Sequence, residues 1–120
     1  MKTANYRERQ TFRKYDDAHY LLYLNEQAGV FDDHEEGQYD GFAYTGEMED
    51  GATMIAATGV TDENRRDKFI AGLVGTRYSI DAQIATLANG ADDEQWAREL
   101  AAFSEFRASC KAQIDELLSR

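Results

Sequence analysis

The last quarter of the chain carries the most regular apolar pattern in the sequence. Apolar residues recur there at alternating steps of four and three, the spacing of one face of a long amphipathic helix. The pattern comprises Trp96, Leu100, Phe103, Cys110, Ile114 and Leu117, with Arg107 as its one polar member. Asp92, followed three residues later by Gln95, forms a capping box. We therefore predict a helix that begins near residue 92 and runs to about Leu118.

Two shorter helices are predicted before it. Residues 62–77 carry a stripe of helical period, with Thr61 or Asp62 as candidate N-cap. The members of this stripe are Phe69, Ile70, Leu73, Val74 and Arg77. A second helix opens at Ser79 and ends at Asn89 and Gly90. Ile80, Ile84 and Leu87 lie on one face of it.

Residues 20–24 leave two interpretations open. Their aromatic and apolar character and their short length favour a strand, paired with Val30 and Phe31 through a turn at residues 25–29. The alternative is a helix that is capped by Asp16 or Asp17 and ends before Gly29. The first interpretation adds β structure to the N-terminal half.

Residues 41–57 predict a β-hairpin. Its strands are residues 41–45 and 53–57, and the connection contains the Asp-Gly turn signal of Asp50 and Gly51. Residues 32–41 are mostly polar and include the glycines Gly37 and Gly41, a composition that predicts a loop. The chain as a whole is therefore predicted to be α+β: a short antiparallel sheet or hairpin in the N-terminal half and three helices in the C-terminal half.

Charge is segregated along the 120 residues, whose net charge is −10. Residues 1–14 hold five basic side chains and one acidic side chain, whereas residues 15–64 hold thirteen acidic ones and no Lys or Arg. We predict a basic arm over residues 1–14 that docks on the acidic segment of another copy or another subunit. The rest, 15–120, is predicted to be one domain with a β-rich acidic part, 15–59, and a helical part, 60–120. Assembly through the arm should weaken when the arm is deleted or salt is raised.

The residue inventory points away from catalysis and from bound cofactors. Starting at Asp32, the acidic loop has the glycine of an EF-hand at Gly37 but His34 at position three and Ala43 at position twelve, so the bidentate carboxylate is missing. Cys110 is the one cysteine, which excludes an intramolecular disulfide and a Cys-rich zinc site. We expect no enzyme activity, no metal and no cofactor.

Targeting and nucleic-acid binding are also constrained. The longest apolar run has five residues, too short to cross a membrane, and residues 1–17 have no apolar core of a signal peptide. These features predict a cytoplasmic protein. The acidic charge disfavours direct binding to nucleic acid.

A protein–protein interaction module is the function that these features favour. The expected binding surface combines the basic arm with aromatic and acidic residues of the middle segment. Its members are Arg7, Arg9, Arg13, Lys14, Tyr39, Tyr44, Glu47, Glu49 and Asp50. The alternative is an acidic inhibitor that mimics nucleic acid and captures a basic nuclease or DNA-binding protein through Glu47, Glu49 and Asp50.

The last helix also resembles the C-terminal helix of small tail-fibre assembly and tail-module accessory proteins of tailed bacteriophages. The resemblance rests on Trp96, Leu100, the segment Phe103-Ser-Glu-Phe106-Arg107, and Ile114-Asp115, with a short helix before them. The family usually has Trp and Tyr before the Arg, whereas both aromatics here are Phe. The resemblance implies a non-enzymatic assembly or virion-associated role, with Trp96, Phe103, Phe106 and Arg107 in helix contacts.

Overall fold

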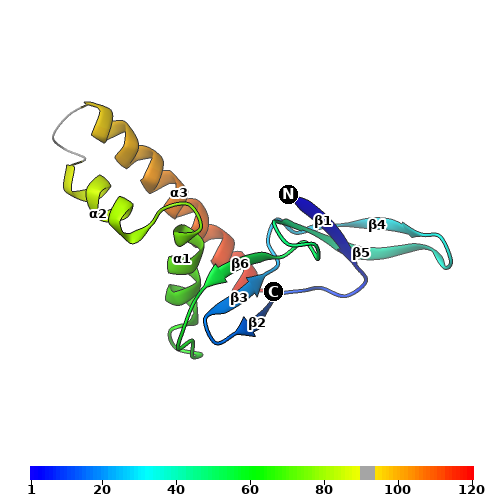
Figure 1. The fold of residues 1–120 in the computed structure, drawn as a ribbon. Helices are drawn as coiled ribbons and strands as arrows, with labels where there is room; N and C mark the ends of the chain where they lie inside the picture. The colour runs from blue at the N-terminus through cyan, green and yellow to red at the C-terminus, as the bar shows by residue number, and fades with distance from the viewer. Residues whose placement is uncertain (90–93) are drawn as a thin grey trace. The chain divides into compact units, whose positions relative to one another are not determined.

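The computed structural model describes residues 1–89 and 94–120, in which six strands precede three helices (Figure 1). These residues divide into two units. The first comprises residues 1–55 and 117–120, and the second comprises residues 56–116. Two antiparallel sheets followed by helices confirm the predicted α+β class. The boundary between the units falls inside the last strand and the last helix, so it differs from the predicted division at residues 59 and 60.

One sheet has the strand order β1-β5-β4. Its strands are β1 (Lys2–Tyr6), β4 (Gln27–Asp33) and β5 (Gly37–Gly46), and both pairings are antiparallel. β4 and β5 form a long hairpin where the sequence predicted a polar loop. Gly37 follows its turn with φ +82°, a conformation that glycine adopts without steric cost. Polar composition therefore did not prevent strand formation.

The other sheet has the order β2-β3-β6. Its strands are β2 (Phe12–Asp16), β3 (His19–Leu22) and β6 (Thr53–Ala56). The ambiguous segment is thus a strand, but its predicted pairing with Val30 and Phe31 is wrong, because those residues lie in β4 and pair with β5. The preceding strand β2 reaches β3 through a much shorter loop, which costs less closure entropy.

The predicted hairpin over residues 41–57 is also wrong in its pairing. β5 and β6 belong to different sheets, because β1 occupies one edge of β5 and β4 occupies the other. A turn links them, in which Met48 N–H donates to the Ala52 carbonyl at 3.0 Å. Gly51 has φ +80° there, and a Cβ on it would lie 2.5 Å from the Tyr44 carbonyl oxygen.

Residues 1–14 do not form a separate arm in this structure. They supply β1 and the first residues of β2, and therefore belong to the first unit. In β1 the register runs from Lys2 opposite Gly46 to Tyr6 opposite Phe42. Residues 2–6 are held in the fold by backbone hydrogen bonds to the central strand β5. The edge of a sheet can pair with any segment that donates and accepts backbone hydrogen bonds.

The core of the first unit is built on tyrosines. Tyr23 and Tyr44 are buried, and Tyr6 packs against them with ring centroids 5.8 to 5.9 Å away. The rings of Tyr23 and Tyr44 meet nearly edge-on at 5.7 Å, a favourable geometry for aromatic pairs. Leu21 and Ala52 complete this buried cluster.

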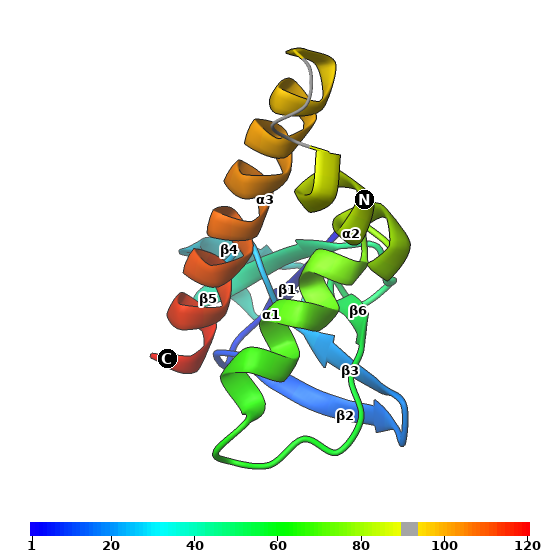
Figure 2. The ribbon, with the colours of Figure 1, turned by 90° about the vertical axis from the view of Figure 1, so that its left-hand side faces the viewer.

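The second unit contains α1 (Arg65–Gly75), α2 (Ile80–Asn89) and most of α3 (Glu94–Leu118), seen from a second side in Figure 2. The three predicted helices are confirmed within a few residues. In the first predicted stripe Phe69, Ile70, Leu73 and Val74 are buried, whereas Arg77 is exposed and follows the end of α1. Buried residues of α3 are Phe103, Cys110 and Ile114.

The predicted helix starts are confirmed only in part. Asn64, rather than Thr61 or Asp62, is the N-cap of α1, and Asn64 and Thr61 exchange hydrogen bonds between backbone and side chain. Ser79 does open α2, since its Oγ accepts from the Ala82 N–H at 3.1 Å. The predicted capping box at residue 92 and the helix stop at residue 90 lie outside the described residues.

Candidate protein-binding surface

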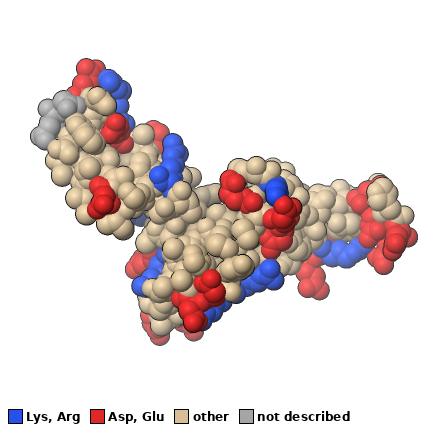
Figure 3. Space-filling model, viewed as in Figure 1, with Lys and Arg blue, Asp and Glu red and all other residues tan. Residues whose placement is uncertain are grey.

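The basic side chains of residues 1–14 are paired within the same chain. Arg7 lies 2.9 Å from Asp33 and 3.0 Å from Glu36 at the end of the β4–β5 hairpin, and its guanidinium lies 4.1 Å from the ring centre of Tyr39. Figure 3 shows acidic side chains gathered at the end of this hairpin with basic ones beside them. The expected partner of the basic segment is therefore present in the same unit.

A second cluster surrounds Glu26, just before β4. Arg9 donates to both carboxylate oxygens of Glu26, at 2.8 to 3.2 Å, and Tyr44 OH donates to it at 2.7 Å. Arg120, whose side chain is 1% exposed, lies 3.5 Å from the same carboxylate and donates to the carbonyls of Gln10 and Tyr23. Tyr44 is therefore a core residue rather than the surface residue predicted from sequence.

Titration behaviour follows from this cluster. Burial alone would raise the pKa of Glu26, but hydrogen bonds from Arg9 and Tyr44 and the charge of Arg120 hold the pKa of Glu26 below its usual value. Burial, together with the hydrogen bond to Glu26, raises the pKa of Tyr44 to about 12. Tyr44 therefore stays protonated at neutral pH and keeps donating.

The third cluster lies at the turn after β5. Asp50 accepts from Tyr23 OH at 2.8 Å and from Arg13 at 3.3 Å, and its Oδ1 accepts from the Ala52 N–H at 3.1 Å. Among the other predicted residues of this region, Glu49 pairs with Lys2, Lys14 lies 3.2 Å from Asp17, and Glu47 is exposed. The acidic turn is therefore tied into the fold of the first unit.

The residues that the resemblance assigned to the last helix are spread around it. Phe103 is buried and meets the Tyr78 ring nearly edge-on at 5.0 Å. Phe106 is half-buried, with its ring 5.7 Å from that of Tyr78, and Trp96 is also half-buried. Arg107 is exposed. Arg107 therefore has the most exposed side chain of this set.

The face of α2 predicted from helical spacing is turned outward. Ile80 is 70% exposed, Ile84 is 61% exposed and Leu87 is 62% exposed. Other exposed large apolar residues, such as Val30 and Tyr15, are separated from one another in sequence and element. We call Ile80, Ile84 and Leu87 the α2 stripe. Sequence reasoning found these residues as a helix face but did not identify them as a binding surface, because the same periodicity describes a face that packs inward.

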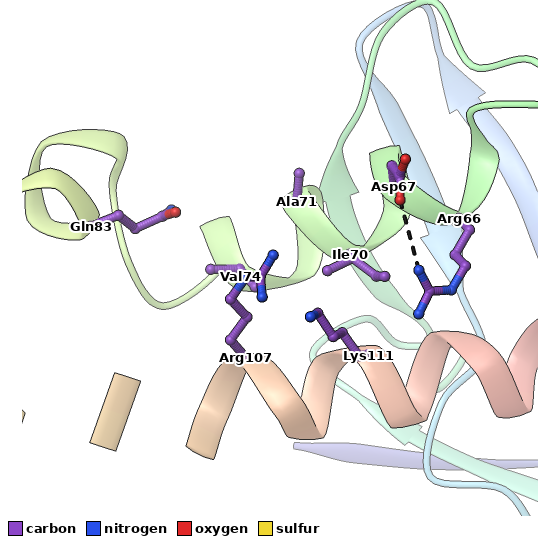
Figure 4. Close-up of a pocket in the computed structure, with 8 residues that line it drawn as sticks. All are labelled: Arg66, Asp67, Ile70, Ala71, Val74, Gln83, Arg107 and Lys111. Atoms are coloured by element: carbon purple, nitrogen blue, oxygen red, sulfur yellow. Dashed lines mark ion pairs between the residues drawn. The ribbon is translucent and has the colours of Figure 1, made fainter. Parts of the chain in front are cut away.

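A groove of about 390 Å³ lies within the same unit (Figure 4). Ile70, Ala71 and Val74 of α1 supply its apolar wall, and Gln83 of α2 lines it as well. Its charged lining residues are Arg66, Asp67, Arg107 and Lys111. The groove therefore combines an apolar surface with three cations in a chain that is acidic overall.

The cations of the groove differ in their pairing. Arg66 makes two contacts with Asp115, at 2.6 and 3.2 Å, and lies 3.8 Å from Asp67. Arg107 and Lys111 form no ion pair with any residue in the described ranges, 1–89 and 94–120. Figure 4 shows both side chains reaching from α3 toward α1. The two cations are thus the groove's open positive charges outside any ion pair. Lys111 is the less open of the two, because its charge helps, after the hydrogen bond from Arg66, to lower the pKa of Asp115.

The described residues contain no cluster of three His, Cys, Asp or Glu side chains that could hold a metal ion. Cys110 is buried, and burial raises the pKa of its thiol, which keeps it protonated and unreactive. In residues 1–89 and 94–120 no helix combines the length and the apolar character that spanning a membrane requires.

Comparison with known proteins finds no match for this chain, whether by family, by sequence or by fold. The resemblance to phage tail accessory proteins therefore stays a prediction.

Proposed function

We propose that this chain is a non-enzymatic protein–protein interaction module that binds its partner through the helical unit. The observation that carries the proposal is the exposure of the α2 stripe, in which three large aliphatic side chains lie on one helix face in solvent. Contiguous exposed apolar residues of this kind mark interaction surfaces in soluble proteins. Burying one such side chain contributes about 1.5 to 3 kcal/mol.

The finer form of the proposal is a role in assembly. The resemblance of the last helix to phage tail accessory proteins supports a partner among the other subunits of a tail, or a further copy of this chain. A chain with that role acts in the cytoplasm or as part of the virion. The basic residues of the first unit contribute less than expected from sequence, because Arg7, Arg9 and Arg13 are engaged with carboxylates of their own chain.

The nucleic-acid-mimicking inhibitor receives less support from the geometry. Such an inhibitor needs free carboxylates for a basic cleft. Asp50 is held by Arg13 and Tyr23 and would have to leave them first. Glu47 is exposed and Glu49 is in a surface pair with Lys2, so only these two of the three predicted carboxylates are accessible. The helical surface is therefore the better candidate.

Substitution of the α2 stripe tests the proposal. The tagged chain is purified from the cells that produce it, as wild type and as the double variant Ile84→Gln/Leu87→Gln, and the mass of each complex is measured by light scattering. Val30→Gln is the matched control, because Val30 is 63% exposed and lies in β4. We expect a complex for the wild type and the control, and the mass of a single chain for the double variant. Equal masses for all three chains would contradict the proposal.

A further inference from the structure

The groove between α1 and α3 has a chemistry that the α2 stripe lacks. Arg107 and Lys111 bring two positive charges that no carboxylate in the described residues neutralises as an ion pair, and Ile70 and Val74 lie beside them. A guanidinium and an ammonium close together attract an oxyanion, and Arg in particular matches the two oxygens of a carboxylate. An apolar wall next to that position favours a ligand with an apolar group beside its charge.

The groove and the α2 stripe are neighbouring parts of one surface. Successive residues of a helix are rotated by about 100°, which places residue 83 roughly 60° from residue 80 and next to the stripe. Gln83 lines the groove while Ile80 is exposed on the stripe, so the two features meet along α2. The Gln83 side chain is held there by its hydrogen bond to the Tyr78 carbonyl, 3.1 Å long. A partner that covers the stripe therefore reaches the groove.

Resting on the proposed function, we propose that the groove receives an acidic side chain of the partner protein, presented next to an apolar residue that packs against Ile70 and Val74. Charge complementarity selects this occupant. An inorganic anion would leave the apolar wall uncovered, and a nucleic acid would be repelled by a chain of net charge −10. An acidic and apolar protein segment satisfies both the cations and the wall.

A peptide selection tests this assignment on the full chain. A displayed library of random twelve-residue peptides is selected against the wild type, and the affinities of enriched peptides are measured for the wild type and for variants. Arg107→Gln and the double variant Arg107→Gln/Lys111→Gln remove the open charges. Arg98→Gln is the matched control, because Arg98 is an exposed cation on the same helix, lies 3.4 Å from Glu94 and does not line the groove.

The expected result is enrichment of peptides that carry Asp or Glu beside an apolar residue. Their affinity should fall about tenfold or more for Arg107→Gln, the size of a lost hydrogen bond between charged groups, further for the double variant, and less than about twofold for Arg98→Gln. Binding should also weaken as salt is raised.

The inference would be overturned by no enrichment, by enriched peptides without acidic residues, or by equal losses for Arg107→Gln and Arg98→Gln. Peptides whose binding is lost with Ile84→Gln but kept with Arg107→Gln would overturn the inference and leave the proposed function standing. The mass measurement on the α2 stripe variants tests the proposed function without any peptide, so the two failures are distinguishable.

Discussion

Glu26 is the residue on which the first unit's polar contacts converge. Its carboxylate accepts hydrogen bonds from Arg9 and Tyr44 and lies 3.5 Å from the buried guanidinium of Arg120, and these residues come from distant parts of the chain. We expect Glu26→Gln to lower the free energy of unfolding by about 3 kcal/mol, because it leaves the buried Arg120 without a counter-charge. Urea denaturation followed by circular dichroism measures the change.

Glu49→Gln is the control for that prediction. Glu49 pairs with Lys2 at the surface, and its side chain is 86% exposed, so water screens the pair. Its loss should cost less than about 1 kcal/mol. Equal costs for the two substitutions would contradict the role given to Glu26.

The raised pKa of Tyr44 makes the free energy of unfolding depend on pH in the alkaline range. Its pKa is 10.0 when unfolded and about 12 in the folded chain, so the folded state resists ionisation. The stabilisation that the protonated Tyr44 gives to the folded state is fully present below pH 10 and is lost as the pH rises from 10 to about 12. Tyr44→Phe should make stability fall less steeply over this range, as measured by urea denaturation at each pH. An unchanged slope would show that Tyr44 does not carry the effect.

The lowered pKa of Glu26 makes the free energy of unfolding depend on pH in the acid range. Because its folded pKa lies below the unfolded value of 4.5, its contribution is present above pH 4.5 and is lost as the pH falls through the folded pKa. Glu26→Gln should therefore flatten the loss of stability on acidification below pH 4.5. The same denaturation series at acid pH checks this expectation, and an equally steep loss in the variant would contradict it.

Residue burial was the weakest part of the sequence prediction. Tyr44 and Tyr39 share a residue type and a charge environment, yet Tyr44 is fully buried and Tyr39 is only half-buried. Alternation along β5 separates their environments, but the sequence did not show which face would be covered. The partners of Tyr44, Gln10 and Glu26, come from segments whose placement depends on the whole sheet arrangement.

At the scale of elements, the turn after β5 depends on Gly51. Its positive φ and the close approach of the Tyr44 carbonyl both exclude a side chain. Gly51→Ala should cost more than about 2 kcal/mol, whereas Gly37→Ala, with φ +82° but nothing within 4 Å, should cost about 1 kcal/mol from backbone strain alone. Thermal unfolding of both variants measures the difference. Equal costs would show that the close approach is not limiting.

The helices could be predicted from the sequence and the strand pairings could not. Helical periodicity is local, so the stripe with Phe69 and Leu73 located α1 and the seam ending at Leu117 located α3. Strand pairing joins residues far apart, and β5 took β1 and β4 as partners instead of the nearby β6. The α2 stripe shows the limit of the periodic signal, because Ile84 has core-like spacing but lies in solvent.

For the whole molecule, the segregated charge along the chain becomes internal pairing in the fold. Deleting residues 1–14 removes β1 and part of β2, so it should disrupt both sheets and the tyrosine core. We expect the near-ultraviolet circular dichroism of the tyrosines to be lost in the truncated chain, and dispersed amide signals of the first unit to be lost in its NMR spectrum. A truncated chain that keeps both signals would restore the arm interpretation.

Site-specific photo-cross-linking in the cells that produce the protein tests directly whether α2 contacts a partner. A photoreactive amino acid replaces Leu87 of the α2 stripe in one chain and the similarly exposed Val30 in another. We expect a discrete cross-linked product of defined mass from position 87 and none from position 30. No product from position 87, or the same products from both positions, would contradict the claim that the helical unit binds a partner through α2.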